Sequence, residues 1–299
     1  MPTSVLRSMT RPTRLRRLPI RIALASALLS CVAVPRLQAQ KHHEDIAFGD
    51  TAAWLDDCEN DSRHDYYDGD ERARRCEVRT VTVKAGGGTI AMDAGRNGGI
   101  AIRGADAGTI TVIAKIVTTA RTQAEADDVA RQVKINVTST EIGSDGPDQT
   151  NHRNWYVSFD VIVPRAAAVS ARTQNGGVSL QGLSGRSEAH AVNGPVSVRD
   201  MSGEVIGRTQ NGPVIAELKG TKWQGAGLDL QTQNGPVNLT IPDGYNAHVE
   251  TGTVNGPMRV DFPVTVQGQI NRRLSLDLGS GGPTIRVVTT NGPVVLRRQ

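Results

Sequence analysis

The residues that could do chemistry in this sequence are carboxylates on expected strands. Asp229, Asp261 and Asp277 could project outward from neighbouring turns of a repeated β fold. Carboxylates about 5 to 10 Å apart suit glycoside hydrolysis. The competing explanation is that outward strand positions are simply polar, and no catalytic signature accompanies the three residues. We therefore predict no catalytic residue, and a polysaccharide-active enzyme on a β-helix is the alternative function.

Other chemistries lack their signatures. The sequence has no P-loop, no G-x-S-x-G elbow, no H-E-x-x-H and no paired-cysteine metal motif. None of the six histidines has metal-ligand spacing; they are His42, His43, His64, His152, His190 and His248. His42 and His43, with Glu44 and Asp45 beside them, could hold a metal, but they lie where we expect a frayed end. We predict no cofactor and no metal.

Residues 40–77 form an acidic segment with two cysteines. Twelve acidic residues lie between Glu44 and Glu77. In an exported chain, the pair Cys58 and Cys76 most simply forms a disulfide, which would stabilise the fold by about 3 kcal/mol in the chain-entropy model. Calcium is the alternative partner of the carboxylates, but the EF-hand spacing is absent. We expect a polar, disulfide-pinned segment that caps the fold and has no core of its own.

Residues 1–39 have the layout of a signal peptide. Seven arginines precede or flank an apolar run over 22–34, and Leu37-Gln38-Ala39 provides a cleavage site after Ala39. We therefore expect export, to the periplasm, the outer membrane or the outside of the cell. Leu28-Leu29-Ser30-Cys31 resembles a lipobox, so membrane attachment would follow if Cys31 is lipidated. Arg16-Arg17 resembles a twin-arginine signal only in those two residues.

The charge of the chain changes once the leader is removed. The sequence has 34 basic and 30 acidic residues. Residues 1–39 hold seven of the basic residues and no acid, so 34 − 7 = 27 basic and 30 acidic residues remain, a net charge of −3. This balance gives no electrostatic reason to expect nucleic acid as a partner.

One short phrase recurs and organises the rest of the chain: Asn-Gly, then Gly or Pro, then an apolar residue. Successive copies from Asn175 to Asn255 are 18 to 23 residues apart, and Gly281-Gly282-Pro283 resembles a degenerate copy before the last one. The copies start at Asn97, Asn175, Asn193, Asn211, Asn234, Asn255 and Asn291. A repeat of about 20 residues indicates stacked units that cannot each bury a core alone.

Each copy predicts strand, turn and strand. Asn-Gly readily takes positive φ at both positions and turns the chain sharply, and alternation such as Val214, Ala216 and Leu218 buries one face. We expect a mainly β fold over 78–299, a parallel β-helix or solenoid of short strands with stacked asparagine turns. A meander of antiparallel hairpins, in a sandwich or barrel, is the competing topology, because Asn-Gly also marks ordinary hairpins.

One helix is expected near 122–133. Thr122 and Glu125 form a capping box, and Val129, Ala130 and Val133 provide an apolar side. We expect this helix to pack on the sheet. The segments 133–142 and 155–163 are expected to pair as two strands around a polar loop at 143–147.

The Thr-x-Asn-Gly-Pro-Val copies, the export signal and the inserted helix together resemble the bacterial putative adhesin domain family, over residues 78–299. The resemblance implies an exported β-helical repeat domain with a surface or periplasmic binding role, and it carries no active-site residues over. We therefore expect a non-enzymatic binding protein of the envelope or cell surface. Its partner would be a glycan, a cell-wall component or a protein, and a structural or signalling role with a protein partner stays open.

Overall fold

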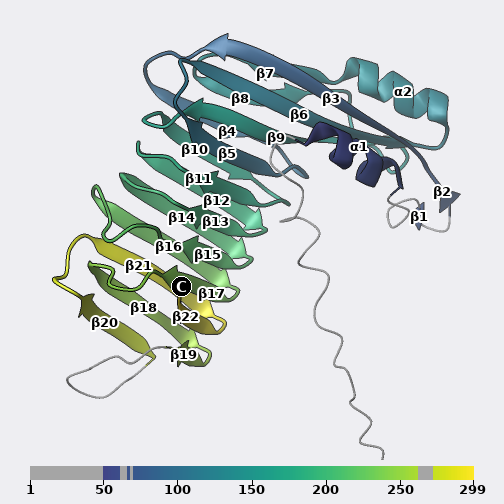
Figure 1. Cartoon of the computed structure of the whole chain (residues 1–299). Coiled ribbons are helices and arrows are strands. Elements are labelled where there is room, and N and C mark those ends of the chain that lie inside the picture. Colours follow the sequence, from purple (N-terminus) through teal and green to yellow (C-terminus); the bar gives the residue numbers. More distant parts are fainter. Residues whose placement is uncertain (1–49, 61–65, 68–69, 262–271) are drawn as a thin grey trace, which may run out of the picture. The chain divides into compact units, whose positions relative to one another are not determined.

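The computed structural model describes residues 50–60, 66–67, 70–261 and 272–299 of the chain. The expected signal peptide, Cys31 and the adjacent His42 and His43 lie outside these residues. The described chain is mainly β, with two ten-stranded sheets, one short two-stranded sheet and two helices (Figure 1). Among the described residues, no helix is both long and apolar enough to span a membrane.

The first large sheet, called sheet 1, runs from one edge to the other as β20, β18, β21, β16, β14, β12, β10, β4, β8 and β7. In chain order its strands are β4 (Thr89–Asp93), β7 (Lys134–Val137), β8 (Glu141–Asp145), β10 (Ala168–Thr173), β12 (Ser187–Asn193), β14 (Glu204–Asn211), β16 (Gly227–Asn234), β18 (Ala247–Asn255), β20 (Arg273–Leu278) and β21 (Thr284–Asn291).

The second large sheet, sheet 2, has the order β19, β22, β17, β15, β13, β11, β5, β9, β6 and β3. Its strands are β3 (Ala73–Lys84), β5 (Ile100–Ala105), β6 (Thr109–Ala120), β9 (Asn154–Pro164), β11 (Val178–Gln181), β13 (Val196–Arg199), β15 (Val214–Glu217), β17 (Val237–Ile241), β19 (Met258–Val260) and β22 (Val294–Arg298). The short strands β1 (Tyr66–Tyr67) and β2 (Asp70–Glu71) pair only with each other.

Each Asn-Gly copy carries the chain from sheet 1 to sheet 2. Strand β12 ends at Asn193 and β13 begins at Val196, and the same step recurs in the neighbouring copies. Equivalent strands pair in parallel without a shift in register, so that Asn193 lies opposite Asn211 and Val196 opposite Val214. The alternate apolar residues of both sheets are buried against one another in one core, for example Leu230 and Leu239.

The seven repeat asparagines form one continuous ladder of side-chain hydrogen bonds. Each Nδ2 group donates to the Oδ1 atom of the asparagine before it in the stack, over 2.7 to 2.9 Å. The order of the ladder is Asn97, Asn175, Asn193, Asn211, Asn234, Asn291 and Asn255. Four of the threonines two places before the asparagines donate to the carbonyl of the preceding Asn-Gly glycine in the stack; they are Thr173, Thr209, Thr232 and Thr289.

The Asn-Gly corners do not use the positive φ angles that the sequence pattern predicted. Among the described non-glycine residues, Asp200 has a positive φ and none of the repeat asparagines does. Of the seven Asn-Gly glycines, only Gly292 has a positive φ, at 154°. The glycine is needed for close approach instead: a Cβ added to Gly212 would lie 2.1 Å from the carbonyl oxygen of Gly194. Stacked corners leave no room for a side chain there.

The last copy in sequence is not the last in space. Strand β21 pairs with β16 on one side and with β18 on the other, and β22 lies between β17 and β19. The final segment of the chain thus lies between two segments that precede it (Figure 1). The expected degenerate copy at Gly281-Gly282-Pro283 forms the turn from β20 into β21, and it adds no position to the asparagine ladder.

Both large sheets are mixed, which departs from the expected wholly parallel β-helix. Strand β6 pairs antiparallel with β3 and β9, β7 with β8, and β18 with β20. The expected pairing of 133–142 with 155–163 is wrong. Residues 134–145 instead fold back on themselves as β7 and β8, because Thr138 closes a tight turn by accepting a hydrogen bond from the Glu141 N–H at 2.9 Å.

The helix expected near 122–133 is present as α2 (Gln123–Gln132). Its N-cap is Thr122, whose side chain accepts a hydrogen bond from the Glu125 N–H. Ala126, Val129 and Ala130 are buried, and the Thr118 hydroxyl of β6 donates to the Ala126 carbonyl at 2.8 Å. The helix therefore packs on the sheet, as its apolar side predicts.

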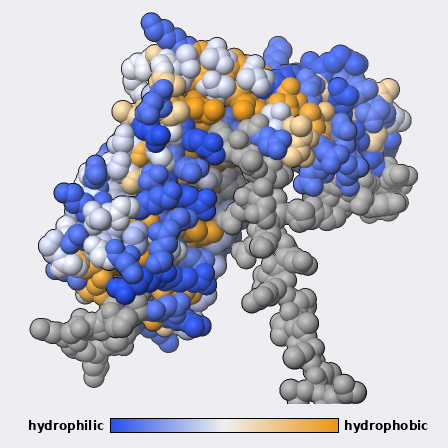
Figure 2. All heavy atoms as spheres, viewed as in Figure 1, coloured by the Kyte–Doolittle hydropathy of each residue, from blue (hydrophilic) through white to orange (hydrophobic). Residues whose placement is uncertain are grey.

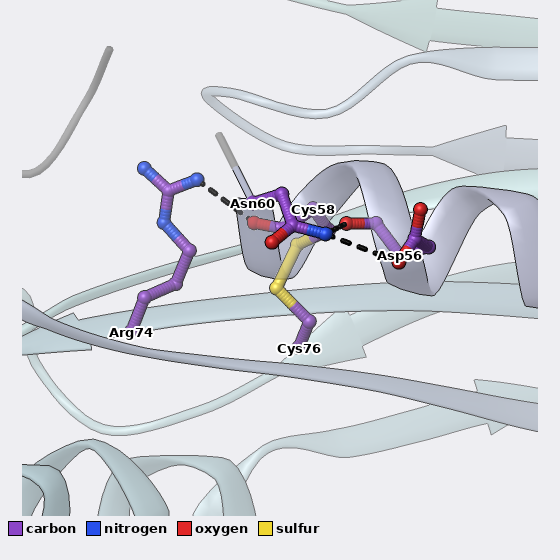
Figure 3. Close-up of a disulfide and its surroundings, with 5 residues drawn as sticks. All are labelled: Asp56, Cys58, Asn60, Arg74 and Cys76. Atoms are coloured by element: carbon purple, nitrogen blue, oxygen red, sulfur yellow. Dashed lines mark hydrogen bonds between the residues drawn. A yellow bond between two sulfur atoms is a disulfide. The ribbon is translucent and has the colours of Figure 1, made fainter. Parts of the chain in front are cut away.

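The acidic segment contains a helix that the sequence pattern did not predict, α1 (Thr51–Asn60). Cys58 on α1 forms a disulfide with Cys76 on β3, and the Arg74 side chain donates to the Cys58 carbonyl (Figure 3). Trp54 lies over the Lys115 ammonium, which is paired with Asp160 at 2.7 Å. Lys115 and Thr118 point to opposite faces of β6 because strand side chains alternate, so α1 and α2 cover opposite faces.

Candidate functional site

The three candidate carboxylates lie apart. Asp229 is on β16 and Asp277 is on β20, and two strands separate β16 from β20 in sheet 1. At a spacing of about 4.8 Å between strands, their backbones are about 14 Å apart. Asp261 follows β19 in sheet 2 and accepts a hydrogen bond from Arg259 at 2.8 Å. No two of the three carboxylates are brought together by the structure as the catalytic pair of a glycosidase.

Asp229 is held as an anion. Its carboxylate accepts hydrogen bonds from Arg208 at 2.6 Å, from Arg286 at 2.9 Å and from Gln231 at 3.1 Å. Partial burial works to raise the pKa of Asp229, but the hydrogen bonds from Gln231, Arg208 and Arg286 outweigh it and lower the pKa below its ordinary value of 3.8. A general acid in glycoside hydrolysis needs a raised pKa, so Asp229 is unsuited to that role.

Sequence reasoning missed a cluster around Asp277. The His248 Nδ1 atom lies 2.7 Å from the Asp277 carboxylate, and its Nε2 atom lies 3.1 Å from the Ser275 hydroxyl. Ser275 and Asp277 are two places apart on β20, and His248 faces them from the antiparallel strand β18. No sequence signal marks this cluster, because the pairing of β18 with β20 sets it. The order serine, histidine, carboxylate is that of a hydrolytic triad.

The surroundings of this cluster are poor for catalysis. Glu250 approaches the same Nε2 atom to 3.6 Å, so a second carboxylate competes with Ser275 for the histidine. The Asp277 side chain is 66% exposed and lies on β20, the edge strand of sheet 1. Triads act where water is excluded and where fixed donors await the developing oxyanion. The contacts are those of a cross-strand polar network.

A groove crosses the outer face of sheet 1 beside the asparagine ladder. We call it the cross-strand groove; its volume is about 740 Å³. It passes over β4, β10, β12, β14 and β16, and a ligand lying in it would cross about 19 Å at the usual strand spacing. Its lining residues are Asp93, Gly95, Arg172, Thr173, Gln174, His190, Ala191, Val192, Arg208, Thr209, Gln210 and Gln233.

Two rows of side chains line the groove, because parallel strands in register place equivalent residues side by side. Asp93, Arg172, His190 and Arg208 form the charged row. Gln174, Val192, Gln210 and Gln233 each precede a repeat asparagine and form a second row. The ladder asparagines follow the second row in sequence and lie outside the lining. The visible face of the stacked strands is mainly hydrophilic (Figure 2).

Most charges on the outer face of sheet 1 are already paired. Arg186 bonds to Glu188 and Glu204, and the raised pKa of Arg186 follows from its hydrogen bond to Glu188 and the charges of both carboxylates. Arg208 and Arg286 share Asp229. Within the described part of the chain, Arg172 and His190 have no side-chain partner. Asp93, opposite Arg172 in register, accepts instead from the Gly95 N–H at 2.7 Å.

Among the described residues, no group of three or more histidine, cysteine, aspartate or glutamate side chains is placed to hold a metal ion. The predicted disulfide between Cys58 and Cys76 is present. All seven predicted turn asparagines lie together, in the ladder that borders the groove.

No protein-family model matches the chain, and no curated protein matches it. Solved structures give likenesses at low identity. A putative cell adhesion protein from Clostridium sporogenes aligns with a TM-score of 0.42 and 9% identity, over 75% of this chain and 100% of that one. A putative adhesin from Bacteroides fragilis aligns with a TM-score of 0.32 and 14% identity, over 75% and 97%. A putative adhesin from Parabacteroides distasonis aligns with a TM-score of 0.28 and 10% identity, over 74% of this chain and 97% of that one.

Proposed function

We propose that this chain is an exported, non-enzymatic binding protein of the cell envelope or cell surface, which holds a glycan or cell-wall component in the cross-strand groove. The main observation in support is the groove, along which equivalent side chains from successive copies lie side by side. Arg172, His190 and three glutamines in the groove have no side-chain partner among the described residues. Such a row of unused polar groups suits an extended ligand with repeating units.

The architecture in this proposal is a β-solenoid over 78–299, with the mixed pairs at its two ends. The support is the run of parallel strands in constant register from β4 to β21 in sheet 1 and from β5 to β22 in sheet 2. Each copy from Asn97 to Asn234 adds one rung to the groove. The length of the binding surface therefore follows from the number of copies.

Export in this proposal rests on two features. Residues 1–39 have the composition of a cleavable leader. The disulfide between Cys58 and Cys76 belongs to an oxidising compartment. The mature protein would be periplasmic, associated with the outer membrane or extracellular, and it would be attached to a membrane if Cys31 is lipidated.

The test incubates the exported form, residues 40–299, with purified envelope polysaccharide and follows retention and soluble sugar release together. Saturable retention without release is the expected result. Release of reducing ends over time would instead identify a polysaccharide-active enzyme. If no envelope fraction retains the protein, the binding function is wrong, and co-purification of a stoichiometric protein would then support a structural or signalling role.

A second candidate function is hydrolysis of an ester. The observation in its favour is the cluster of Ser275, His248 and Asp277, with both hydrogen bonds at the lengths of a triad. The competing Glu250 and the open surface weigh against it. Binding in the groove is affected neither by Glu250 nor by the exposure of the cluster, so binding stays the first proposal.

A further inference from the structure

We infer that the ligand of the cross-strand groove is an acidic glycan, whose carboxylates meet Arg172 and His190 and whose hydroxyls meet the glutamine amides. This inference rests on the proposed binding function and names its ligand class. The charged side chains, the amides and the exposed Val192 of the groove support it.

Arg172 and His190 offer hydrogen-bond donors that suit an anion. Arg172 lies on β10 and His190 on β12, directly opposite each other in register, so their backbones are about 4.8 Å apart. No carboxylate of the described chain pairs with either residue, although the arginines beside them on the same face are paired. An arginine that keeps its five donors free in a groove suits a carboxylate, which can accept two parallel hydrogen bonds from it.

The amides select hydroxyl groups. Gln174, Gln210 and Gln233 are exposed and make no side-chain hydrogen bond within the described residues. An amide offers both a donor and an acceptor, as a sugar hydroxyl does. Val192 lies in the same row and is 39% exposed. It offers the C–H face of a sugar ring an apolar contact between the amides of Gln174 and Gln210.

The small number of free cations argues against a ligand recognised by charge alone. Residues 40–299 have 27 basic and 30 acidic residues. A polyanion such as a nucleic acid gains its affinity from many phosphate contacts, whereas this groove has one unpaired arginine and one histidine, beside the Asp93 carboxylate. A ligand that carries both carboxylates and hydroxyls along its length better matches a groove in which a charged row lies beside an amide row.

The direction of the groove fixes how a chain would lie. The groove runs across the strands, so each rung of the stack presents the same positions again after about 4.8 Å. A polymer would therefore lie parallel to the asparagine ladder, with its carboxylates toward the charged row and its hydroxyls toward the amide row. A single sugar would use only part of these contacts.

The experiment measures retention of the exported protein on immobilised polygalacturonate, on neutral dextran and on polyphosphate. We expect saturable retention on polygalacturonate, at least tenfold tighter than on the other two, and weakening as salt rises because the ion pairs are exposed. Arg172→Gln and His190→Gln should each weaken binding about tenfold or more, because each removes at least one hydrogen bond to a charged group.

Arg297→Gln is the matched control. Arg297 is an exposed arginine on β22 in the other sheet and has no ion pair among the described residues. Its replacement removes the same charge from the protein and should leave retention unchanged. An equal loss in R297Q and R172Q would show that net charge, and no site, governs binding, and the inference would be wrong.

The other outcomes of the retention experiment also test the ligand class and the binding function. Equal retention on polygalacturonate and dextran, unaffected by R172Q, would overturn the acidic ligand and leave the binding function standing. Retention on polyphosphate as tight as on polygalacturonate would overturn the glycan. If none of the three matrices and no envelope fraction retains the protein, both the inference and the proposed function fail.

Discussion

At the scale of single residues, the asparagine and the glycine of each Asn-Gly pair have different roles. The asparagine joins neighbouring copies through its amide, and the glycine lets their backbones approach. A Cβ at Gly176, Gly194 or Gly235 would lie 2.0 to 2.2 Å from a carbonyl oxygen of the next corner, which no real contact allows. The sequence therefore repeats glycine for packing between copies, whereas a hairpin would need it for its φ angle.

The first prediction concerns Gly212. Gly212→Ala should destabilise the fold by about 1 to 3 kcal/mol, the usual cost of overpacking, because its Cβ would meet the Gly194 carbonyl. Gly87→Ala is the matched control, since a Cβ there has nothing within 4 Å and its φ is ordinary. Urea unfolding should separate the two variants. Equal midpoints would mean that the corners are not closely stacked.

The second prediction concerns Asp229 and pH. A carboxylate whose pKa is lowered in the folded state contributes stability above its unfolded pKa, and this contribution is lost as pH falls through the folded pKa. Asp229→Asn should therefore cost stability at neutral pH, where Arg208 and Arg286 lose their anion. The difference between the variant and the parent should shrink below pH 3.8. A difference independent of pH would contradict the role of the charge.

The residue scale also shows what the sequence can and cannot predict. The apolar alternation and the seven asparagines predicted the strands and their common turn, because both are local patterns. Arg172 and His190 gave no signal, since a free charge is recognised only once its neighbours are known. The contact between His248 and Asp277 depends on an antiparallel pairing that no local pattern encodes.

At the scale of elements, α1 is the clearest departure from the sequence prediction. Residues 51–60 are too polar for an apolar face to predict a helix, and no residue of α1 is buried. The helix depends on the disulfide and on Trp54 over Lys115 for its attachment to the sheet. Such an element folds through tertiary contacts, and helix propensity alone would leave it marginal.

The third prediction is that reducing the disulfide releases α1 first. Cys58→Ser with Cys76→Ser should remove about 3 kcal/mol from the attachment of the 18-residue loop. Because the opening is local, amide exchange should rise in α1 and stay slow in the β12 and β14 strands. Trp54 fluorescence should shift as the ring leaves Lys115. Two free thiols in the exported native protein would exclude the bridge and with it this prediction.

The fourth prediction uses the spatial order of the last two copies. Asn291 lies inside the ladder, where it donates to Asn234 and accepts from Asn255, while Asn255 is at its end and only donates. Asn291→Ala should therefore cost about 2 kcal/mol and Asn255→Ala about 1 kcal/mol, at about 1 kcal/mol for each hydrogen bond. If the ladder followed the order of the chain, Asn291 would be at its end, and Asn255→Ala would be the more destabilising of the two changes. Denaturant midpoints of the two variants decide between the orders.

At the scale of the whole molecule, the sequence predicts a stack of copies, and the structure adds how the stack ends. Antiparallel pairs flank the parallel run at both ends of sheet 1, through β7 with β8 and β18 with β20. The insertion of β21 and β22 ahead of β18 and β19 could not be predicted, because each copy carries the same pattern and their order in space depends on long-range pairing.

The last prediction tests whether the molecule lacks hydrolytic activity at the cluster of Ser275, His248 and Asp277. A fluorophosphonate that labels activated serines should leave Ser275 unmodified, because Glu250 competes for His248 and the cluster lies open to water. Ser275→Ala should neither change retention on envelope polysaccharide nor remove any release of acyl groups from it. Mass spectrometry of the labelled protein is the readout. Stoichiometric labelling of Ser275, abolished in His248→Gln, would instead make the cluster a nucleophile and move the chain from binding proteins to hydrolases.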